Sequence, residues 1–153
     1  MYAGIGKEIS EIHLLIAGNG KEYVNLKSLV HSLGMDEWVT FLGYVTNLEE
    51  YQKAADLGVS CSKREGLPLN IVEAMLSGNP VVVTDNRGHR ELIVDGETGF
   101  IVPVDNVEKM KERIFDIFEN VKLESRLKEN SINRGKMYTD SYITKELEEW
   151  YLY

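Results

Sequence analysis

Two carboxylates in the stretch EGLPLNIVEAML, residues 65–76, are the first candidates for chemistry. Glu65 precedes an apolar run with helical spacing, and Glu73 lies inside that run. A carboxylate on a mostly apolar helix is costly to bury unless it is paired or hydrogen-bonded. Glu73 therefore either forms an ion pair with Lys or Arg at the surface or binds a specific ligand. A carboxylate can accept two hydrogen bonds from vicinal hydroxyls, which suits the diol of a ribose or hexose.

The turn between the two glutamates has the features of an anion site. Pro68 suits the first turn of a helix because the N–H that it lacks would be unpaired there, so we predict a helix from about Pro68 to Ser77. The N-terminus of a helix offers N–H groups and the positive end of the helix dipole to a phosphate. Gly66 would let an anion approach the backbone closely. A second turn, AGNGKE at residues 17–22, contains Gly18 and Gly20 and is either a ligand-binding turn or a tight strand-to-helix turn.

Short apolar runs alternate with segments of helical spacing and set the expected architecture. The runs cover residues 12–17, 38–43, 56–61, 80–84 and 99–103. Most are nearly continuous, as in strands covered on both faces of a parallel sheet. The order predicts an α/β fold with an open, doubly wound, Rossmann-like parallel sheet. Ligands bind such sheets outside the carboxyl ends of the strands.

The last third of the chain changes character. From about residue 106 to residue 153 the pattern predicts three amphipathic helices without strands between them. We expect Ile114, Phe115, Ile117 and Phe118 to pack inward, and the charges to form solvated faces.

Length, charge and cysteine content limit the function classes. The 153 residues suffice for one domain, residues 1–153, with a real core. A formal charge of −8 disfavours binding to nucleic acid and to anionic lipids. The single cysteine, Cys61, is expected to be a small buried hydrophobe, and its use fits a reducing compartment. There is no apolar stretch of membrane-spanning length and no signal-like N-terminus, which indicates a cytoplasmic protein.

The stretch EGLPLNIVEAMLSGNPVVVTDNRGHRELIVDGETGFIV resembles the nucleotide-sugar half of the retaining glycosyltransferases called group 1. These enzymes have the GT-B fold of two facing Rossmann-like domains, and their hallmark is two glutamates separated by seven residues, as Glu65 and Glu73 are. The segments LLIAGNG and VTFLGYV also match in order, so that the resemblance covers roughly residues 12–120. One segment, TDNRGHRELI, is similar to members that build capsule or exopolysaccharide repeat units.

The resemblance implies roles for individual residues. Glu65 would lie by the donor sugar as the catalytic residue, and Glu73 would accept hydrogen bonds from the ribose hydroxyls. The resemblance also implies three further groups of nucleotide-sugar contacts. The loop of Gly43, Tyr44 and Val45 would border the base, and the turn of Gly18, Asn19 and Gly20 would line the cleft. The backbone of Gly66, Leu67, Pro68 and Leu69 would border the sugar and diphosphate.

The implied reaction transfers a sugar from a nucleoside diphosphate sugar to an acceptor hydroxyl with retention, as in polysaccharide or glycoconjugate biosynthesis. Its main demand is stabilisation of the departing diphosphate. Similar enzymes meet it with the helix N-terminus and an Arg/Lys pair, without a metal or other cofactor.

That Arg/Lys pair would lie upstream of Met1, together with the first strand of this half and the acceptor-binding N-terminal domain. We therefore expect a C-terminal half that is inactive alone and that meets a membrane, if at all, through the missing half, at the inner face in the full-length protein. Lys63 and Arg64 are weak substitutes because adjacent side chains rarely point the same way.

Two other functions remain open from the residues. One is a binding module that holds a nucleotide or nucleotide-sugar without transfer, and the other is a hydrolase with Glu65 and Glu73 as an acid/base pair. The hydrolase ranks last because a helix N-terminus between the carboxylates suits phosphate better.

Two further segments carry expectations. His89 either faces the cleft from its rim or is a surface loop residue, and the second interpretation is favoured. Trp150, Tyr151 and Tyr153 would be exposed without the other half, so this chain is expected to self-associate.

Overall fold

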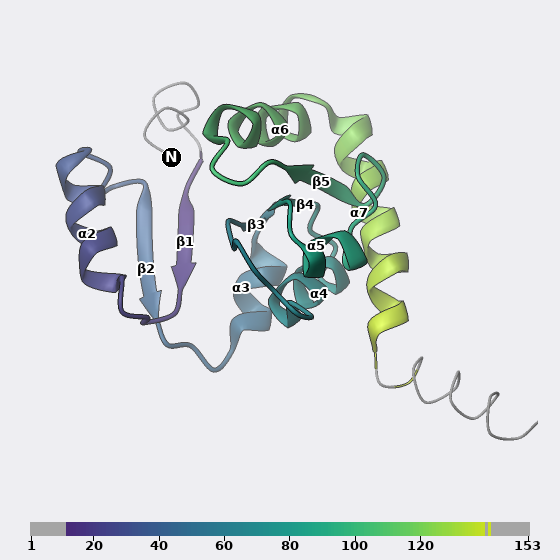
Figure 1. The fold of residues 1–153 in the computed structure, drawn as a ribbon, viewed down its shortest axis with the longest axis horizontal. Helices are drawn as coiled ribbons and strands as arrows, with labels where there is room; N and C mark the ends of the chain where they lie inside the picture. Colours follow the sequence, from purple (N-terminus) through teal and green to yellow (C-terminus); the bar gives the residue numbers. More distant parts are fainter. Residues whose placement is uncertain (1–11, 140, 142–153) are drawn as a thin grey trace, which may run out of the picture. The chain divides into compact units, whose positions relative to one another are not determined.

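The computed structural model describes residues 12–139 and 141 (Figure 1). The chain divides into two compact units, Met1–Leu48 and Glu49–Tyr153.

The first unit contains a parallel two-stranded sheet and one helix. Strand β1 (Leu14–Ala17) pairs with β2 (Val39–Gly43), and helix α2 (Tyr23–Ser32) connects them. The ring of Tyr23 meets that of Phe41 edge-on, with the ring centroids 5.4 Å apart, and so fastens α2 to β2. Gly34, at φ +64°, follows the C-cap of α2 and ends the helix in the left-handed conformation that glycine adopts at low cost.

The second unit contains a parallel three-stranded sheet in the order β3-β4-β5. Its strands are β3 (Gly58–Ser60), β4 (Val81–Thr84) and β5 (Gly99–Val102). Its helices are α3 (Leu48–Ala54), which begins at the last residue of the first unit, α4 (Leu69–Leu76), α5 (Arg87–Leu92), α6 (Val107–Glu119) and α7 (Val121–Gly135), followed by the 3₁₀ turn η1 (Lys136–Tyr138). Helices α4 and α5 each follow a strand and therefore begin near the carboxyl edge of this sheet.

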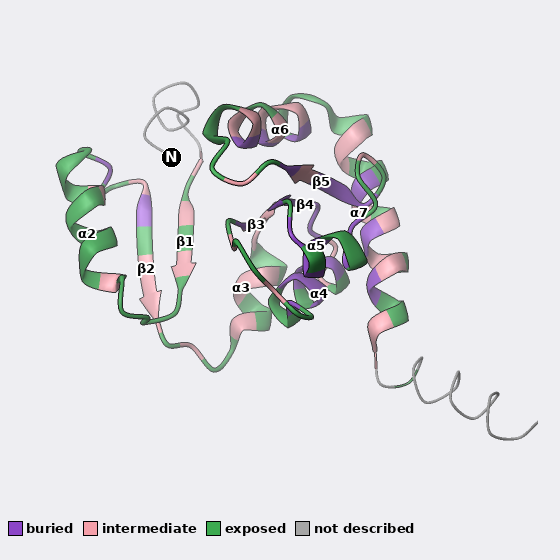
Figure 2. Ribbon diagram, viewed as in Figure 1, coloured by how far each residue is buried: buried purple, intermediate pink, exposed green. Residues whose placement is uncertain are grey.

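The core lies around β4, whose four residues are all buried (Figure 2). One buried cluster joins Val81 and Val83 to Met75 of α4 and Leu92 of α5. Helices α6 and α7 add Ile114, Ile117 and Leu127, each at most 2% exposed. Among the described residues of the first unit, by contrast, only Met35 and Val39 are buried.

The predicted fold class and all five predicted strands are confirmed. Burial on both faces is confirmed for β4 and is wrong for β1, whose residues alternate between half-buried and exposed. The first two C-terminal helices are present, but Phe118 is 36% exposed and not packed inward, because α6 turns only one stripe toward the sheet.

The third predicted helix, with Trp150, Tyr151 and Tyr153, lies outside the described residues. Organisation as one domain over residues 1–153 stays a prediction. In residues 12–139 and 141, every helix is too short or too polar to cross a bilayer.

Candidate functional site

The site in the second unit is built on the connection between β3 and α4. Helix α4 starts at Leu69, one residue after the predicted Pro68, which is its N-cap in an extended conformation. The carbonyl of Pro68 accepts hydrogen bonds from the N–H groups of Ile71 and Val72. No side chain caps α4, and the first N–H groups of a helix have no acceptor within it, so those of Leu69 and Asn70 are available to a ligand.

The residues before Pro68 leave this helix start accessible. Gly66 is exposed, and nothing lies within 4 Å of the position that a Cβ would take there. Leu67 and Leu69 are 49% and 61% exposed, whereas Pro68 itself is buried. An anion can therefore reach the positive end of α4 without displacing a side chain that caps it.

The two glutamates lie on either side of this helix start, and both carboxylates are available. Glu65 is half-buried and Glu73 is exposed, although Glu73 sits among the buried residues of α4. Within residues 12–139 and 141, neither carboxylate forms an ion pair or a side-chain hydrogen bond. The surface ion pair considered for Glu73 is thus not observed in the described part of the chain.

The two basic residues before Glu65, Lys63 and Arg64, have different surroundings. Lys63 pairs with Asp105, at 2.8 Å between its Nζ and the carboxylate, and both side chains are more than two-thirds exposed. Arg64 is exposed. A surface pair of this kind contributes little to stability.

The site residues predicted in the first unit lie at the carboxyl edge of its own sheet. The N–H of Gly18 donates to the carbonyl of Gly43 at 2.6 Å, which ties the turn after β1 to the turn after β2. Both glycines have positive φ, +117° and +67°, so these turns need residues without a Cβ. Tyr44 is 77% exposed and Asn19 is exposed. The structure therefore brings together Gly18, Gly20 and the loop 43–45 in one unit, and residues 65–69 with Glu73 in the other.

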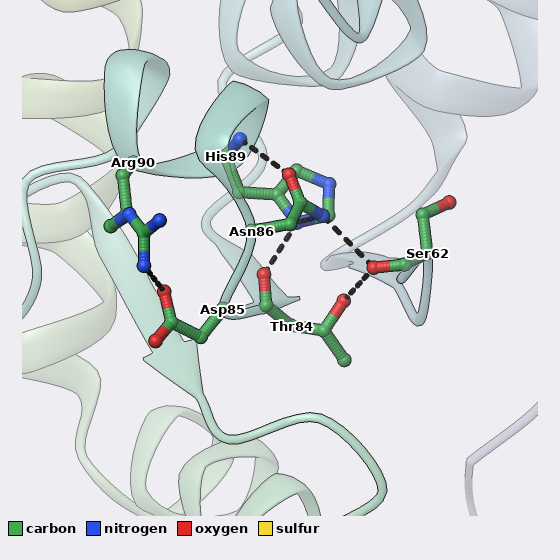
Figure 3. A network of polar contacts seen from close by, with 6 residues as sticks. All are labelled: Ser62, Thr84, Asp85, Asn86, His89 and Arg90. Atoms are coloured by element: carbon green, nitrogen blue, oxygen red, sulfur yellow. Dashed lines mark hydrogen bonds and ion pairs between the residues drawn. The ribbon is translucent and has the colours of Figure 1, made fainter. Parts of the chain in front are cut away.

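Two sequence interpretations are wrong in the second unit. His89 is fully buried and not a surface loop residue, since it lies in α5 with its ring against the carbonyl of Thr84 (Figure 3). Cys61 is exposed and not a buried hydrophobe, because β3 ends at Ser60. Although the residue as a whole is exposed, partial desolvation of its thiol raises the pKa of Cys61.

The residues before His89 have a structural role that was not predicted from the sequence. Asn86 is the N-cap of α5 and accepts a hydrogen bond from the N–H of His89 at 3.0 Å. Gly88 packs directly on the backbone of Glu65 and Gly66. An Asn three residues before a buried position, just after a strand, is the signal that would have indicated this cap.

Comparison with known proteins agrees with this geometry. Residues 2–134 match the family model described as "Glycosyl transferases group 1". The chain is 30% identical over 145 residues to EpsD of Bacillus subtilis (strain 168), covering 95% of this chain and 38% of EpsD. It is 31% identical over 135 residues to the poly(glycerol-phosphate) alpha-glucosyltransferase of the same strain, covering 87% of this chain and 20% of that enzyme.

The fold is similar to that of a solved structure, Alr3699/HepE of Anabaena in complex with UDP. The two superpose with a TM-score of 0.80 and 26% identity, over 90% of this chain and 41% of HepE. This chain therefore spans less than half the length of each of these three proteins.

Proposed function

Because this chain belongs to the group 1 glycosyl transferases, we propose that it is the C-terminal, donor-binding half of an enzyme that transfers a sugar from a nucleoside diphosphate sugar to an acceptor hydroxyl. The acceptor-binding domain is assigned to a part of the protein outside this chain, which spans 38% of the length of EpsD. The relative named poly(glycerol-phosphate) alpha-glucosyltransferase supports a place in polysaccharide or glycoconjugate biosynthesis.

One observation carries the proposal: the N-terminus of α4 is uncapped, accessible and flanked by Glu65 and Glu73, whose carboxylates form no ion pair within the described part of the chain. The diphosphate would accept hydrogen bonds from the N–H groups of Gly66, Leu67 and Leu69 and lie at the positive end of the helix dipole. Negative charge grows on the diphosphate as the sugar leaves, so fixed donors at this place stabilise the transition state more than the ground state. This role needs no metal ion or other cofactor from the chain.

The carboxylates would bind the two sugars of the donor. Glu73, exposed and four residues into α4, is suited to accept hydrogen bonds from both ribose hydroxyls. Glu65 would lie beside the transferred sugar and is assigned as the catalytic carboxylate. Both lie beside the diphosphate site along the chain, so that one nucleoside diphosphate sugar engages both.

Residues of the first unit are proposed as further nucleotide-sugar contacts, as the family resemblance implies. The loop Gly43, Tyr44 and Val45 is assigned to the base, and the turn Gly18, Asn19 and Gly20 is assigned to the nucleotide-sugar without a more specific role. Their backbone is accessible because nothing lies within 4 Å of a Cβ position at Gly18, Gly20 or Gly43. The complex of HepE with UDP supports a uridine nucleotide as the first donor to test.

Retention of anomeric configuration follows the family resemblance and the similarity to an alpha-glucosyltransferase. We place the protein in the cytoplasm, where nucleoside diphosphate sugars are made, with any membrane contact through the other half.

The proposal is tested by calorimetric titration of this chain with UDP, GDP and ADP. We expect one nucleotide to bind, and Glu73→Ala to raise its Kd at least about tenfold, since each hydrogen bond to a charged group contributes about 1.5–3 kcal/mol. Glu129→Ala is the matched control, because Glu129 is also an exposed glutamate within a helix. Equal affinities for Glu73→Ala and Glu129→Ala would contradict the assignment of Glu73 to the ribose.

A further inference from the structure

We propose that Asn86, Gly88 and His89 are positioning residues that set the conformation of the segment 62–66, called here the donor turn. The name rests on the function proposed above. The conformation of the donor turn is then set by contacts with other residues and not by its own sequence. It is fixed by the connection between β4 and the first turn of α5, whose residues touch no substrate.

The first link is a shared acceptor at the start of the donor turn. The carbonyl oxygen of Ser62 accepts hydrogen bonds from the hydroxyl of Thr84, at 2.5 Å, and from the side-chain amide of Asn86, at 2.9 Å. Figure 3 shows both donors converging on this oxygen. Thr84 is 4% exposed and Asn86 is 6% exposed, so water competes little for these hydrogen bonds.

The second link orients Asn86 through His89. The Nδ1 of His89 lies 2.6 Å from the carbonyl oxygen of Thr84, and a carbonyl can only accept, so Nδ1 carries the proton. The contact of 2.8 Å between this Nδ1 and the amide nitrogen of Asn86 then joins two donors and is no hydrogen bond. The amide nitrogen of Asn86 is therefore directed to Ser62, while its oxygen accepts from the N–H of His89.

This assignment leaves the other ring nitrogen of His89 without a proton. Nε2 is buried and has no hydrogen-bond partner among the residues that the structure describes. Placing a proton there would bury an unsatisfied donor, which is costly. The environment of His89 thus favours one tautomer, the one that the link to Asn86 requires.

The third link is a close backbone approach at Gly88. A Cβ at this position would lie 2.2 Å from the carbonyl oxygen of Gly66 and 3.0 Å from the carbonyl oxygen of Glu65. Real contacts of this kind do not come so close, so any side chain at Gly88 must push the donor turn away. The glycine therefore sets how near the donor turn lies to α5.

The far end of α5 is fixed as well, which makes the helix a rigid support. Arg134 of α7 donates to the carbonyls of Leu92 and Glu91, at 3.1 and 2.8 Å, and the hydroxyl of Tyr138 donates to the same carbonyl of Glu91 at 2.7 Å. A cation at a helix C-terminus is also favoured by the helix dipole. A push at Gly88 is therefore transmitted to the donor turn and not absorbed by a shift of α5.

The first experiment uses Gly88→Ala in this chain, with Gly99→Ala as the matched control. A Cβ at Gly99 would also meet a backbone oxygen, that of Val81 at 2.5 Å. Gly99 is the first residue of β5 and therefore lies at the edge of the sheet opposite to the carboxyl edge that carries the site. Amide spectra without ligand should show Glu65, Gly66 and Leu67 shifted in Gly88→Ala and unshifted in Gly99→Ala. In the same samples the Kd for UDP should rise at least tenfold in Gly88→Ala alone.

A second variant pair covers the case in which Gly88→Ala does not fold. Asn86→Asp keeps the oxygen that caps α5 but replaces the donor to Ser62 by a carboxylate oxygen. Asn106→Asp is the control, because Asn106 caps α6 in the same way through the N–H of Lys109. Asn86→Asp should shift the amides of the donor turn and weaken UDP binding, and Asn106→Asp should do neither.

The tautomer of His89 supplies a direct spectroscopic check, since ¹⁵N shifts of the imidazole should show Nδ1 protonated and Nε2 bare. Unshifted donor-turn amides in both Gly88→Ala and Asn86→Asp would overturn the inference, as would a proton on Nε2. If the amides shift but the unaltered chain binds none of UDP, GDP and ADP, the proposed donor site fails while the positioning of the turn stands.

Discussion

The turns at the carboxyl edges of the two sheets are built in opposite ways. In the first unit the turn after β1 depends on two glycines with positive φ and one backbone hydrogen bond, from Gly18 to Gly43, and its surroundings are open. In the second unit the donor turn is held by buried side chains of Thr84 and Asn86 and by packing on Gly88. One turn is shaped by its own backbone and the other by its neighbours.

The same contrast holds for the cores behind the turns. The first unit buries only Met35 and Val39 among its described residues, and its helix α2 leaves Leu29 49% exposed. The second unit buries a continuous cluster around β4, and α7 contributes Leu127 at 0% exposure. A site that must hold a diphosphate in fixed geometry is expected on the more rigid support, which agrees with the diphosphate site proposed for the second unit.

Substitutions in the two cores should differ most in the free energy of unfolding. Leu127→Ala should lower the free energy of unfolding by about 2–5 kcal/mol, because it removes a fully buried side chain and leaves a cavity. Leu29→Ala should change it by no more than about 0.5 kcal/mol, as is usual for exposed positions. Urea denaturation followed by circular dichroism measures both, and equal losses would erase the contrast between the units.

The next effect concerns the support of α5. Arg134→Ala removes two hydrogen bonds from a charged group to the carbonyls of Glu91 and Leu92 and should cost about 1.5–3 kcal/mol. Arg87→Ala is the control, since Arg87 is exposed and pairs with Glu91 only across the surface of α5. The pair at Arg87 is worth about 0.3–0.5 kcal/mol. If both variants lose the same stability in urea, the far end of α5 is not fixed as described.

The smallest effect compares the chemical environment of the two turns. Because burial raises the pKa of the Cys61 thiol, a smaller fraction is thiolate at any pH below that pKa, and alkylation by iodoacetamide should be slow. A thiol introduced by Asn19→Cys, in a Cys61→Ser background, should react at the ordinary rate because position 19 lies between two glycines with open surroundings. Both rates rise with pH, and the rise should come at higher pH for Cys61. Coinciding pH profiles would contradict the difference.

The sequence was sufficient for the order of elements and for the helix that presents the site. Periodicity and turn residues located every strand, and Pro68 located the start of α4 to within one residue. These features are local: they depend on a few consecutive residues and on backbone preferences. The spacing of Glu65 and Glu73 is likewise visible in the sequence without knowledge of the fold.

The errors concern burial and close contacts, which depend on the folded structure and not on residue type alone. His89 has the polarity expected of a loop residue, but hydrogen bonds to the carbonyl of Thr84 and to the side chain of Asn86 offset the cost of its burial. Cys61 lies in an apolar run that continues past the end of β3, and Phe118 lies just outside the buried stripe of α6. The clash that a side chain at Gly88 would cause involves Gly66 and Glu65, 22 and 23 positions earlier, which no local pattern indicates.

We expect the N-terminus of α4 to hold the diphosphate of the donor. A map of amide shifts in this chain at saturating UDP measures this contact. The largest shifts should occur at Gly66, Leu67, Leu69 and Asn70, with smaller shifts at Glu73 and in the loop 43–45. Saturable binding of UDP with these four amides unchanged would contradict this expectation.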